Sequence, residues 1–325
     1  MLAGFGISSD LELPALHAPP NLAHAVRHLR GTMRTALRRV APNAVIVQGD
    51  TSSAYAGARA AHDLALRVAH VEAGLRTDDV GDPFPEEWFR RRIRHYAAWH
   101  FAPCASAVAN LLAEGIARET IHRVGNTGID SLRVVLDRLD LEPNARRSRT
   151  IVVTLHRREN WDRNAEILCD ALLAIAATRP DVSIVFPVHP NPRIARRIRR
   201  RLGAHLAIHL VDPMEYPEFI RLVAQAALVI SDSGGIQEEA PHLGTPLLVP
   251  RSNTERPECL ATGFVQLVSA EHDSIVQSAL ALLAAPPPLA LPFDAAAPFG
   301  AGDAAERIAR VLDAEVPMGE AHAGR

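Results

Sequence analysis

Cysteine, long apolar runs and an excess of charge of one sign are all scarce in this 325-residue chain. Its three cysteines, Cys104, Cys169 and Cys259, lie far apart and form no metal-ligand pair. Few, scattered thiols favour a reducing compartment over the disulfide framework of a secreted protein. No apolar stretch is long enough to cross a bilayer, and the opening residues lack a basic leader. We therefore expect a soluble, cytoplasmic protein.

The balance of charge also excludes a class of partners. The 35 basic residues minus the 37 acidic residues give a net charge of −2. A chain of this kind offers no bulk attraction to nucleic acid or to an anionic membrane, so we expect neither as a partner. A hydrophobic fraction of 48% can bury substantial cores, and the length predicts about two domains.

Short apolar runs alternate with segments of helical period, which predicts βαβ units and parallel sheets with helices on both faces. The first series begins with "AVIVQGD", and the second begins with "TIVVTL". A polar patch around residues 140–149 separates them and is typical of a linker. We expect an α/β protein with two doubly wound, Rossmann-like domains around a cleft, residues 1–145 and 146–290. Residues 291–325 are expected to form a loop and a last helix that packs back on the first domain.

One stretch of the second series, "SDSGGIQEEAPHLGTPLLVPRSNTERPE", points to a phosphate site. A strand ends before Ser233, and a helix begins at Gly234 and Gly235. Backbone N–H groups at such a helix start bind phosphates, and glycine allows a close approach of the ligand. Glu239, one turn further, can accept hydrogen bonds from ribose hydroxyls, and Arg256 adds a cation. The alternative is an ordinary helix with Asp232 or Ser233 as its N-cap.

Carboxylates and a histidine collect at other predicted strand ends. Asp50 closes one strand, Glu72 follows the next, and Glu86 begins a helix after two prolines. Ligand-facing residues of this architecture gather at the carboxyl edge of the sheet. A helix-stabilising acid is the alternative for Glu86. His156, in "TLHRREN", can stabilise a diphosphate, whereas His189, in "PVHPNP", is more typical of a structural loop.

Together these stretches resemble the non-hydrolysing UDP-N-acetylglucosamine 2-epimerases. The resemblance rests on "QGDTS", "HVEAGLRT", "PFPEE", "TLHRREN", "PVHPNP", "SDSGGIQEEAPHLGTPLLV" and "TERPE", in that order over roughly residues 40 to 270. It implies a glycosyltransferase-B type fold, no metal or redox cofactor, and a homodimer. It also implies catalytic roles for four residues: Asp50, Glu72 and Glu86 as acid/base carboxylates, and His156 near the diphosphate. The contacts to UDP that it implies come from His156, Phe219, Ser233, Gly234, Gly235, Glu239 and Arg256.

The reaction that the resemblance implies is an epimerisation at C2 of the sugar. UDP is eliminated across C1–C2 and then added back with the proton on the other face, which needs a base and an acid on opposite faces. The product would supply a surface-polysaccharide pathway. Two alternatives remain: an epimerase for a related UDP-sugar, such as a 2,3-diacetamido uronate, and a UDP-sugar binder without turnover.

The chain departs from the family pattern in two places. The family's opening strand, its "Gly-Thr-Arg-Pro-Glu" turn and its Lys-bearing helix have no counterpart, so we expect a first domain that is N-terminally truncated. Either the start given lies downstream of the true one, or this is a shortened homologue with impaired activity. In addition, Phe89 stands where the family usually has Asn, which replaces a polar contact by an apolar ring.

Overall fold

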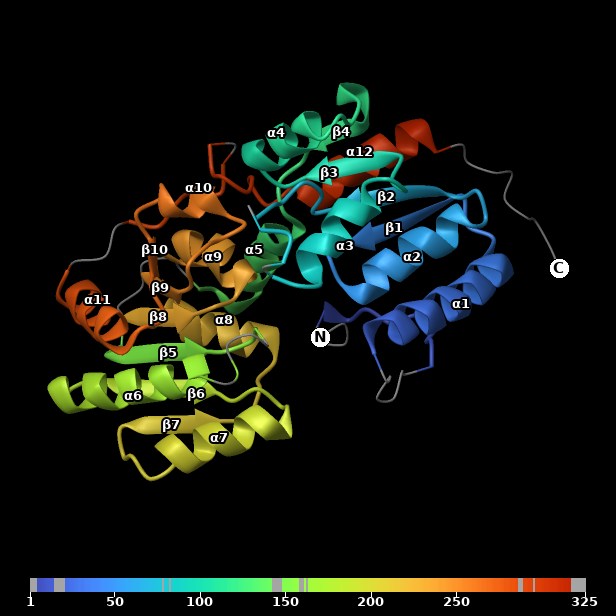
Figure 1. Ribbon diagram of the computed structural model, residues 1–325. Helices are drawn as coiled ribbons and strands as arrows, with labels where there is room; N and C mark the ends of the chain where they lie inside the picture. Colours follow the sequence, from blue (N-terminus) through green and yellow to red (C-terminus); the bar gives the residue numbers. More distant parts are fainter. Residues whose placement is uncertain are drawn as a thin grey trace. The chain divides into compact units, whose positions relative to one another are not determined.

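The chain divides into two compact units in the computed structural model, which describes residues 5–14, 21–77, 79–81, 83–141, 148–157, 161, 163–285, 289–294 and 296–316. The C-terminal unit contains the described residues within Met1–Ser8 and Ser131–Phe293, and the N-terminal unit those within Ser9–Asp130 and Asp294–Arg325. Each unit is built around a sheet of its own (Figure 1).

The sheet of the N-terminal unit has four parallel strands in the order β1-β2-β3-β4. The strands are β1 Ala44–Gln48, β2 Arg67–Val71, β3 Trp99–Ala102 and β4 Ile121–Arg123. The helices of this unit are α1 Leu22–Val40, α2 Ser52–His62, α3 Glu86–Ile93, α4 Ala105–Ala113 and α12 Ala304–Glu315, with a 3₁₀ turn at Arg118–Thr120. Helix α5, Thr127–Leu139, crosses the boundary between the units in sequence.

Apolar clusters cover both faces of this sheet. One contains Tyr55, Val68 and Phe89, on the side of α2 and α3, and the other joins Trp99 to Ile308 of α12. The predicted last helix thus packs on this sheet, and Asp130 accepts hydrogen bonds from the amides of its first two residues, at 3.1 and 2.8 Å. Among the described residues β1 has only one neighbouring strand, and its Ile46 is 56% exposed.

The C-terminal unit has six parallel strands in the order β10-β9-β8-β5-β6-β7. Because β5 lies between β8 and β6, the chain changes direction there, and the crevice at the carboxyl ends of β5 and β8 is the usual ligand position in such a sheet. The strands are β5 Thr150–Thr154, β6 Ser183–Pro187, β7 Ile208–Val211, β8 Leu228–Ser231, β9 Leu247–Pro250 and β10 Val265–Val268. The helices are α6 Arg163–Thr178, α7 Pro192–Leu202, α8 Tyr216–Ala224, α9 Gly234–Leu243, α10 Pro257–Leu260 and α11 His272–Ala284.

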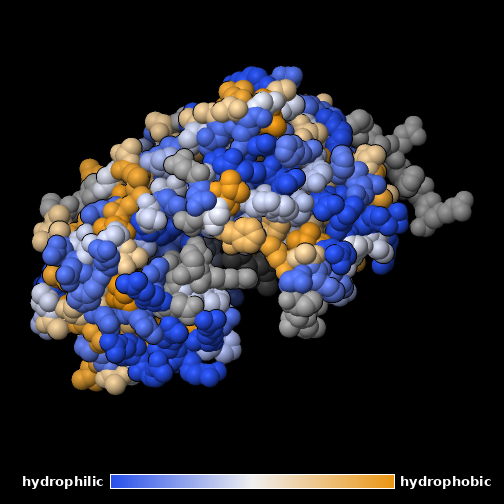
Figure 2. Space-filling view, viewed as in Figure 1, coloured by the Kyte–Doolittle hydropathy of each residue, from blue (hydrophilic) through white to orange (hydrophobic). Residues whose placement is uncertain are grey.

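Helix α7 is strongly amphipathic, with one apolar face and one basic face. Ile194, Ile198 and Leu202 are buried in the core, while the remaining surface of the helix is rich in arginine. Figure 2 shows hydrophilic side chains over the region at the lower left that α7 occupies in Figure 1. The arginine-rich face is therefore a solvated helix face.

The predicted fold class is confirmed: the chain is an α/β protein with two parallel sheets. Every strand expected from its apolar run is present. Most of the expected linker, residues 142–147, lies outside the described residues. No helix in the described part of the chain has the length and apolar character that crossing a membrane requires.

Candidate functional site

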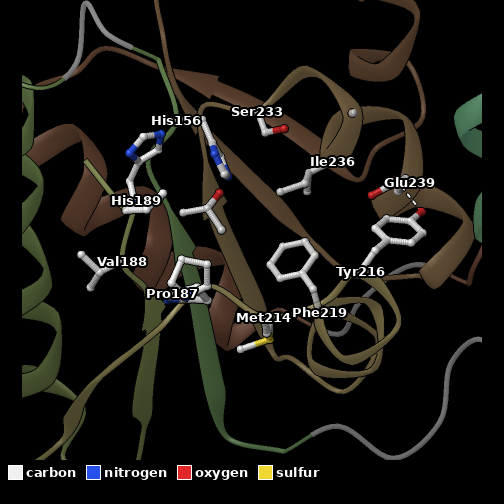
Figure 3. Close-up of a pocket in the computed structure, with 14 residues that line it drawn as sticks. His156, Pro187, Val188, His189, Met214, Tyr216, Phe219, Ser233, Ile236 and Glu239 are labelled. Atoms are coloured by element: carbon white, nitrogen blue, oxygen red, sulfur yellow. Dashed lines mark hydrogen bonds between the residues drawn. The ribbon is translucent and has the colours of Figure 1, made fainter. Parts of the chain in front are cut away.

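A cavity of about 420 Å³ lies at the carboxyl ends of the central strands of the C-terminal unit (Figure 3). Five predicted ligand-binding residues line it: His156, Phe219, Ser233, Gly235 and Glu239. The remaining lining residues are Thr154, Pro187, Val188, His189, Pro190, Pro213, Met214, Tyr216 and Ile236. Five of the fourteen lining residues are thus ones for which the sequence predicts a ligand contact, and those contacts stay predictions.

The start of α9 faces this cavity as a set of backbone donors. Ser233 occupies the N-cap position, but its side chain makes no capping hydrogen bond. The first backbone N–H groups of a helix have no partner within the helix, so a phosphate can accept them. Ser231 Oγ accepts a hydrogen bond from the Ser233 amide at 3.0 Å, which fixes the turn before the helix.

Asp232 does not cap this helix. Its carboxylate instead accepts hydrogen bonds from the backbone amides of His156 and Arg157, at 2.9 and 3.0 Å. It is completely buried, and it joins the end of β8 to the loop after β5. The alternative of an Asp232 cap is thus wrong, and the residue positions the loop that carries His156.

Arg256 is buried beside the start of α9. Its guanidinium forms an ion pair with Glu238, and a second carboxylate, Glu255, lies 3.8 Å away. Glu255 is itself buried and is paired with Arg157 at 2.6 Å and Arg251 at 3.1 Å. The cation is therefore held in a rigid network, and its contact with a phosphate stays a prediction.

His156 and His189 both line the cavity, with ring centroids 6.3 Å apart. The His189 Nδ1 accepts a hydrogen bond from the Asn191 amide at 3.1 Å, which agrees with the structural role expected from its loop. The position of its ring on the cavity wall adds a contact that the sequence did not indicate. Residues 158–160 of "TLHRREN" lie outside the described residues.

In the N-terminal unit, Asp50 and Glu72 follow neighbouring strands. The Gly49 amide donates to the Val71 carbonyl at 3.0 Å, which extends the pairing of β1 and β2 by one residue. The backbone positions of Asp50 and Glu72, which come next, are therefore close together. A Cβ placed on Gly49 would lie 3.4 Å from Glu72 Oε2, so the Glu72 carboxylate lies over this turn. Glu72 has a φ of 64°, which is rare for a residue with a side chain and typical of functional sites.

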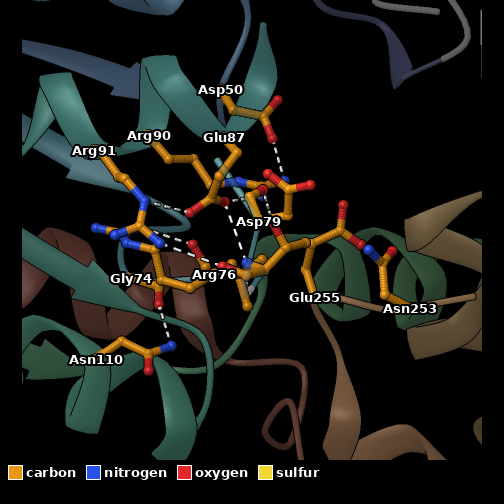
Figure 4. Close-up of polar contacts among 12 residues, drawn as sticks. Asp50, Gly74, Arg76, Asp79, Glu87, Arg90, Arg91, Asn110, Asn253 and Glu255 are labelled. Atoms are coloured by element: carbon orange, nitrogen blue, oxygen red, sulfur yellow. Dashed lines mark hydrogen bonds and ion pairs between the residues drawn. The ribbon is translucent and has the colours of Figure 1, made fainter. Parts of the chain in front are cut away.

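A buried ion network surrounds this sheet edge (Figure 4). The Arg90 guanidinium forms ion pairs with Asp50 and with Glu87, the latter at 3.0 Å. Glu87 is completely buried and also pairs with Arg91 at 2.8 Å. Glu86, by contrast, is half-buried and begins α3 one turn before Arg90. Adjacent glutamates thus lie in different surroundings, and only Glu87 is a member of the buried network.

Glu114, the residue that follows α4, also belongs to this network. It pairs with Arg76 at 2.8 Å and with Arg91 at 3.4 Å, and also contacts Arg94. Although burial raises the pKa of Glu114, the guanidiniums of Arg76 and Arg94 outweigh this and lower it to about 2. The segment that carries Glu72 and Arg76 is therefore anchored to α4 by charge.

His70, two residues before Glu72, supports the turn at Gly49. Its Nε2 lies 2.9 Å from the Gly49 carbonyl oxygen, while Nδ1 has no partner within the described structure. Burial lowers the pKa of His70 to about 4, so the ring is neutral and Nε2–H donates to the carbonyl. The sequence did not indicate this role, because His70 lies among the apolar residues of a strand.

Phe89 packs into the core of the N-terminal unit. It is 1% exposed, and its ring stacks on Tyr55 with 5.1 Å between centroids. The apolar ring at this position is accommodated by aromatic neighbours, Tyr55 and Trp88. Across the described residues, no group of three or more His, Cys, Asp and Glu side chains is arranged to hold a metal ion.

Comparison with known proteins identifies the family of this chain. The family model for UDP-N-acetylglucosamine 2-epimerase matches residues 1–313. A probable UDP-N-acetylglucosamine 2-epimerase of Ralstonia solanacearum is 38% identical over 322 residues, covering 95% of this chain and 86% of the relative. The UDP-N-acetylglucosamine 2-epimerase of Escherichia coli K12 is also 38% identical, over 95% of this chain and 85% of its own length.

Solved structures give the same result. The UDP-GlcNAc 2-epimerase of Neisseria meningitidis, bound to UDP-GlcNAc, superimposes with a TM-score of 0.88 at 33% identity, over 97% of this chain and 88% of that one. The Methanocaldococcus jannaschii enzyme, in complex with UDP-GlcNAc and UDP, gives 0.81 at 32% identity, over 90% of this chain and 82% of that one. The chain belongs to the UDP-N-acetylglucosamine 2-epimerase family.

Proposed function

We propose that this chain interconverts UDP-N-acetylglucosamine and UDP-N-acetylmannosamine. The observation that carries the proposal is the pair of carboxylates, Asp50 and Glu72, at adjacent strand ends in a family whose members bear the name of this activity. The cavity with the backbone donors of α9 supplies a place for the nucleotide.

The proton at C2 is not adjacent to a carbonyl, so enolisation cannot release it. In the proposed reaction a carboxylate removes this proton while the C1–O bond breaks. UDP leaves with the bonding pair, and a C1–C2 double bond remains. In the return step a UDP oxygen attacks C1, and an acid on the opposite face gives C2 its new proton. Atoms and charge balance without a redox partner.

We assign the proton transfers to the side chains of Asp50, Glu72 and Glu86. His156 and the start of α9 are assigned to the diphosphate, where negative charge develops as UDP leaves. Phe219 is assigned to the uracil and Glu239 to the ribose, since both line the cavity. These roles place the acid/base groups in a domain of residues 1–145 and the nucleotide groups in a domain of residues 146–290, with residues 291–325 returning to the first.

We further propose that the protein acts as a homodimer in the cytoplasm and supplies precursors of a surface polysaccharide. The near-neutral net charge and the three buried thiols support a reducing, aqueous compartment. The family resemblance supports the dimer and the pathway. Sedimentation analysis at several concentrations tests the dimer: a monomer at all of them would contradict it.

The activity is tested by incubating the chain with UDP-N-acetylglucosamine in heavy water and following C2 by proton NMR. The expected product has the manno configuration with deuterium at C2. Removing the carboxylate base in Glu72→Gln is expected to slow this exchange by about 10²- to 10⁴-fold. Glu119→Gln, at an exposed glutamate in the same unit, is the matched control and is expected to leave it unchanged. Folded protein that gives neither exchange nor product would overturn the proposal.

A further inference from the structure

Tyr216 and Glu239 form a hydrogen-bonded pair in the wall of the cavity (Figure 3). The Tyr216 hydroxyl donates to Glu239 Oε1 at 2.8 Å. Tyr216 is the first residue of α8, and Glu239 lies in the second turn of α9, so two different helices hold the pair. The Tyr216 ring also contacts Phe5, with 6.2 Å between centroids. The tyrosine is thus fixed at its ring and at its hydroxyl.

The Glu239 carboxyl is otherwise open to the cavity. Within the described residues, the bond from Tyr216 is the one hydrogen bond that this carboxyl makes. Its second oxygen, Oε2, makes no hydrogen bond within the described residues, and the half-buried side chain lines the cavity. A carboxylate held by one oxygen leaves the lone pairs of the other for donors of a ligand.

The surroundings of Glu239, burial above all, disfavour its ionised form. Burial raises the pKa of Glu239 to about 8; the hydrogen bond from Tyr216 opposes this rise, and the Glu238 carboxylate adds to it. Arg256 is engaged by Glu238, and His156 and His189 are the other titratable groups on the cavity wall. At neutral pH Glu239 is therefore largely protonated before a ligand binds.

We propose that Tyr216 is a positioning residue for Glu239, and that a ligand with two adjacent hydroxyls, the ribose of a nucleotide, drives a proton from this carboxyl into solvent when it binds. A ribose diol offers two O–H donors, which an ionised carboxylate accepts better than a protonated one. Tyr216 orients Glu239 and favours the ionised form that the ligand needs. The inference rests on the proposed function in taking UDP as the ligand.

The test measures UDP affinity and proton release by calorimetry from pH 6 to pH 9, in two buffers of different ionisation enthalpy. Four proteins are compared: wild type, Tyr216→Phe, Glu239→Gln and Tyr96→Phe. Tyr96 lies in the N-terminal unit, and its substitution is the control for loss of a tyrosine hydroxyl elsewhere. The UDP phosphate also titrates in this range. Its contribution is common to all four proteins, so differences between proteins isolate Glu239.

Protonation of Glu239 is expected to weaken UDP binding to wild type by up to about tenfold for each pH unit below pH 8, since only the ionised form binds well. Glu239→Gln is expected to lose this part of the pH dependence and the proton release that accompanies it. Tyr216→Phe is expected to bind UDP about tenfold more weakly at pH 7 and to approach wild type near pH 9, because a lost bond to a charged group raises the pKa of the carboxyl. Tyr96→Phe is expected to follow wild type.

A second ligand distinguishes the contribution of the ribose hydroxyls from that of the phosphates. UDP that lacks both ribose hydroxyls is expected to bind wild type without the Glu239 component of proton release. The inference is overturned if Tyr216→Phe follows wild type at every pH, or if Glu239→Gln retains the full linkage. Turnover is measured in parallel. If the protein is an active epimerase but UDP binding releases no proton from Glu239, this inference alone is contradicted. If UDP binding releases that proton but no turnover occurs, the proposed function alone is contradicted.

Discussion

The guanidinium of Arg256 occupies the space that a side chain on Gly234 would need. A Cβ placed on Gly234 would be 2.4 Å from Arg256 Nη1, which is closer than any stable contact. The φ of Gly234 is not in the left-handed region, so the need for glycine here is one of space and not of backbone conformation. The sequence Ser-Gly-Gly thus accommodates the Arg256 guanidinium at its first glycine, while Ser233 and Gly235 line the cavity.

Gly234→Ala is therefore expected to displace the Arg256 guanidinium from Glu238. Loss of that charge-assisted hydrogen bond is expected to cost about 2 kcal/mol in the free energy of unfolding, measured by urea titration. Gly235→Ala is the matched control, since a Cβ there would have no heavy atom within 4 Å. Equal stability of the two variants would contradict the steric argument.

His70 is expected to make stability depend on pH in mildly acidic solution. Its folded-state pKa of about 4 lies below the ordinary value of 6.5, because burial disfavours the charged ring. The unfolded chain therefore binds more protons between these values, and the stabilisation present above pH 6.5 is lost as the pH falls toward 4. The shift corresponds to about 3 kcal/mol.

This dependence is checked with urea unfolding at intervals from pH 7 to pH 4. His70→Gln retains an N–H that can donate to the Gly49 carbonyl but does not titrate. The variant is expected to lose about 3 kcal/mol less than wild type over this range. Parallel curves for the two proteins would show that His70 takes up no proton on unfolding.

The fold was predictable from the sequence because its parallel strands are short, apolar on both faces and separated by amphipathic helices. "AVIVQ" and "LVIS" illustrate this, and both form strands where expected. Cavity-lining residues such as Ser233 and Glu239 were predictable because they lie in the segment that follows a strand, and the carboxyl ends of parallel strands meet at one edge of the sheet.

The pairs that position these residues were not predictable, because they join positions far apart in the sequence. Asp232 contacts amides 75 and 76 residues earlier, and Tyr216 reaches Glu239 across two helices. No local sequence pattern indicates contacts between residues so far apart in the chain. Likewise, only the packing shows that Glu87, and not Glu86, enters the ion network, although both follow Pro85 in the same helix turn.

Phe219 is expected to contribute mainly to binding of the base. Its ring lines the cavity, and stacking of an aromatic side chain on a base contributes about 1 to 3 kcal/mol. Phe219→Leu is therefore expected to weaken UDP binding about tenfold, measured by calorimetry. Inhibition by inorganic pyrophosphate, which has no base, serves as the control and is expected to stay unchanged. A loss of both affinities would point instead to a collapsed cavity.

The adjacent glutamates of α3 allow stability and catalysis to be separated. Glu87 is completely buried and pairs with Arg90 at 3.0 Å and Arg91 at 2.8 Å. Glu87→Gln leaves the buried guanidinium of Arg90 short of one counter-charge, and removing one partner of a buried pair costs about 3 kcal/mol or more. Unfolding followed by the fluorescence of Trp88 and Trp99, both in this unit, measures the loss.

Glu86→Gln is expected to behave in the opposite way. Glu86 is half-buried, so its substitution is expected to change the free energy of unfolding by less than about 0.5 kcal/mol. As a proposed acid/base group, its loss is expected to slow C2 exchange by about 10²-fold or more. The two variants differ by one position and carry the same chemical change, so each is the control for the other. A stable, inactive Glu87→Gln beside a destabilised, active Glu86→Gln would reverse the assignment and place the catalytic carboxylate inside the buried network.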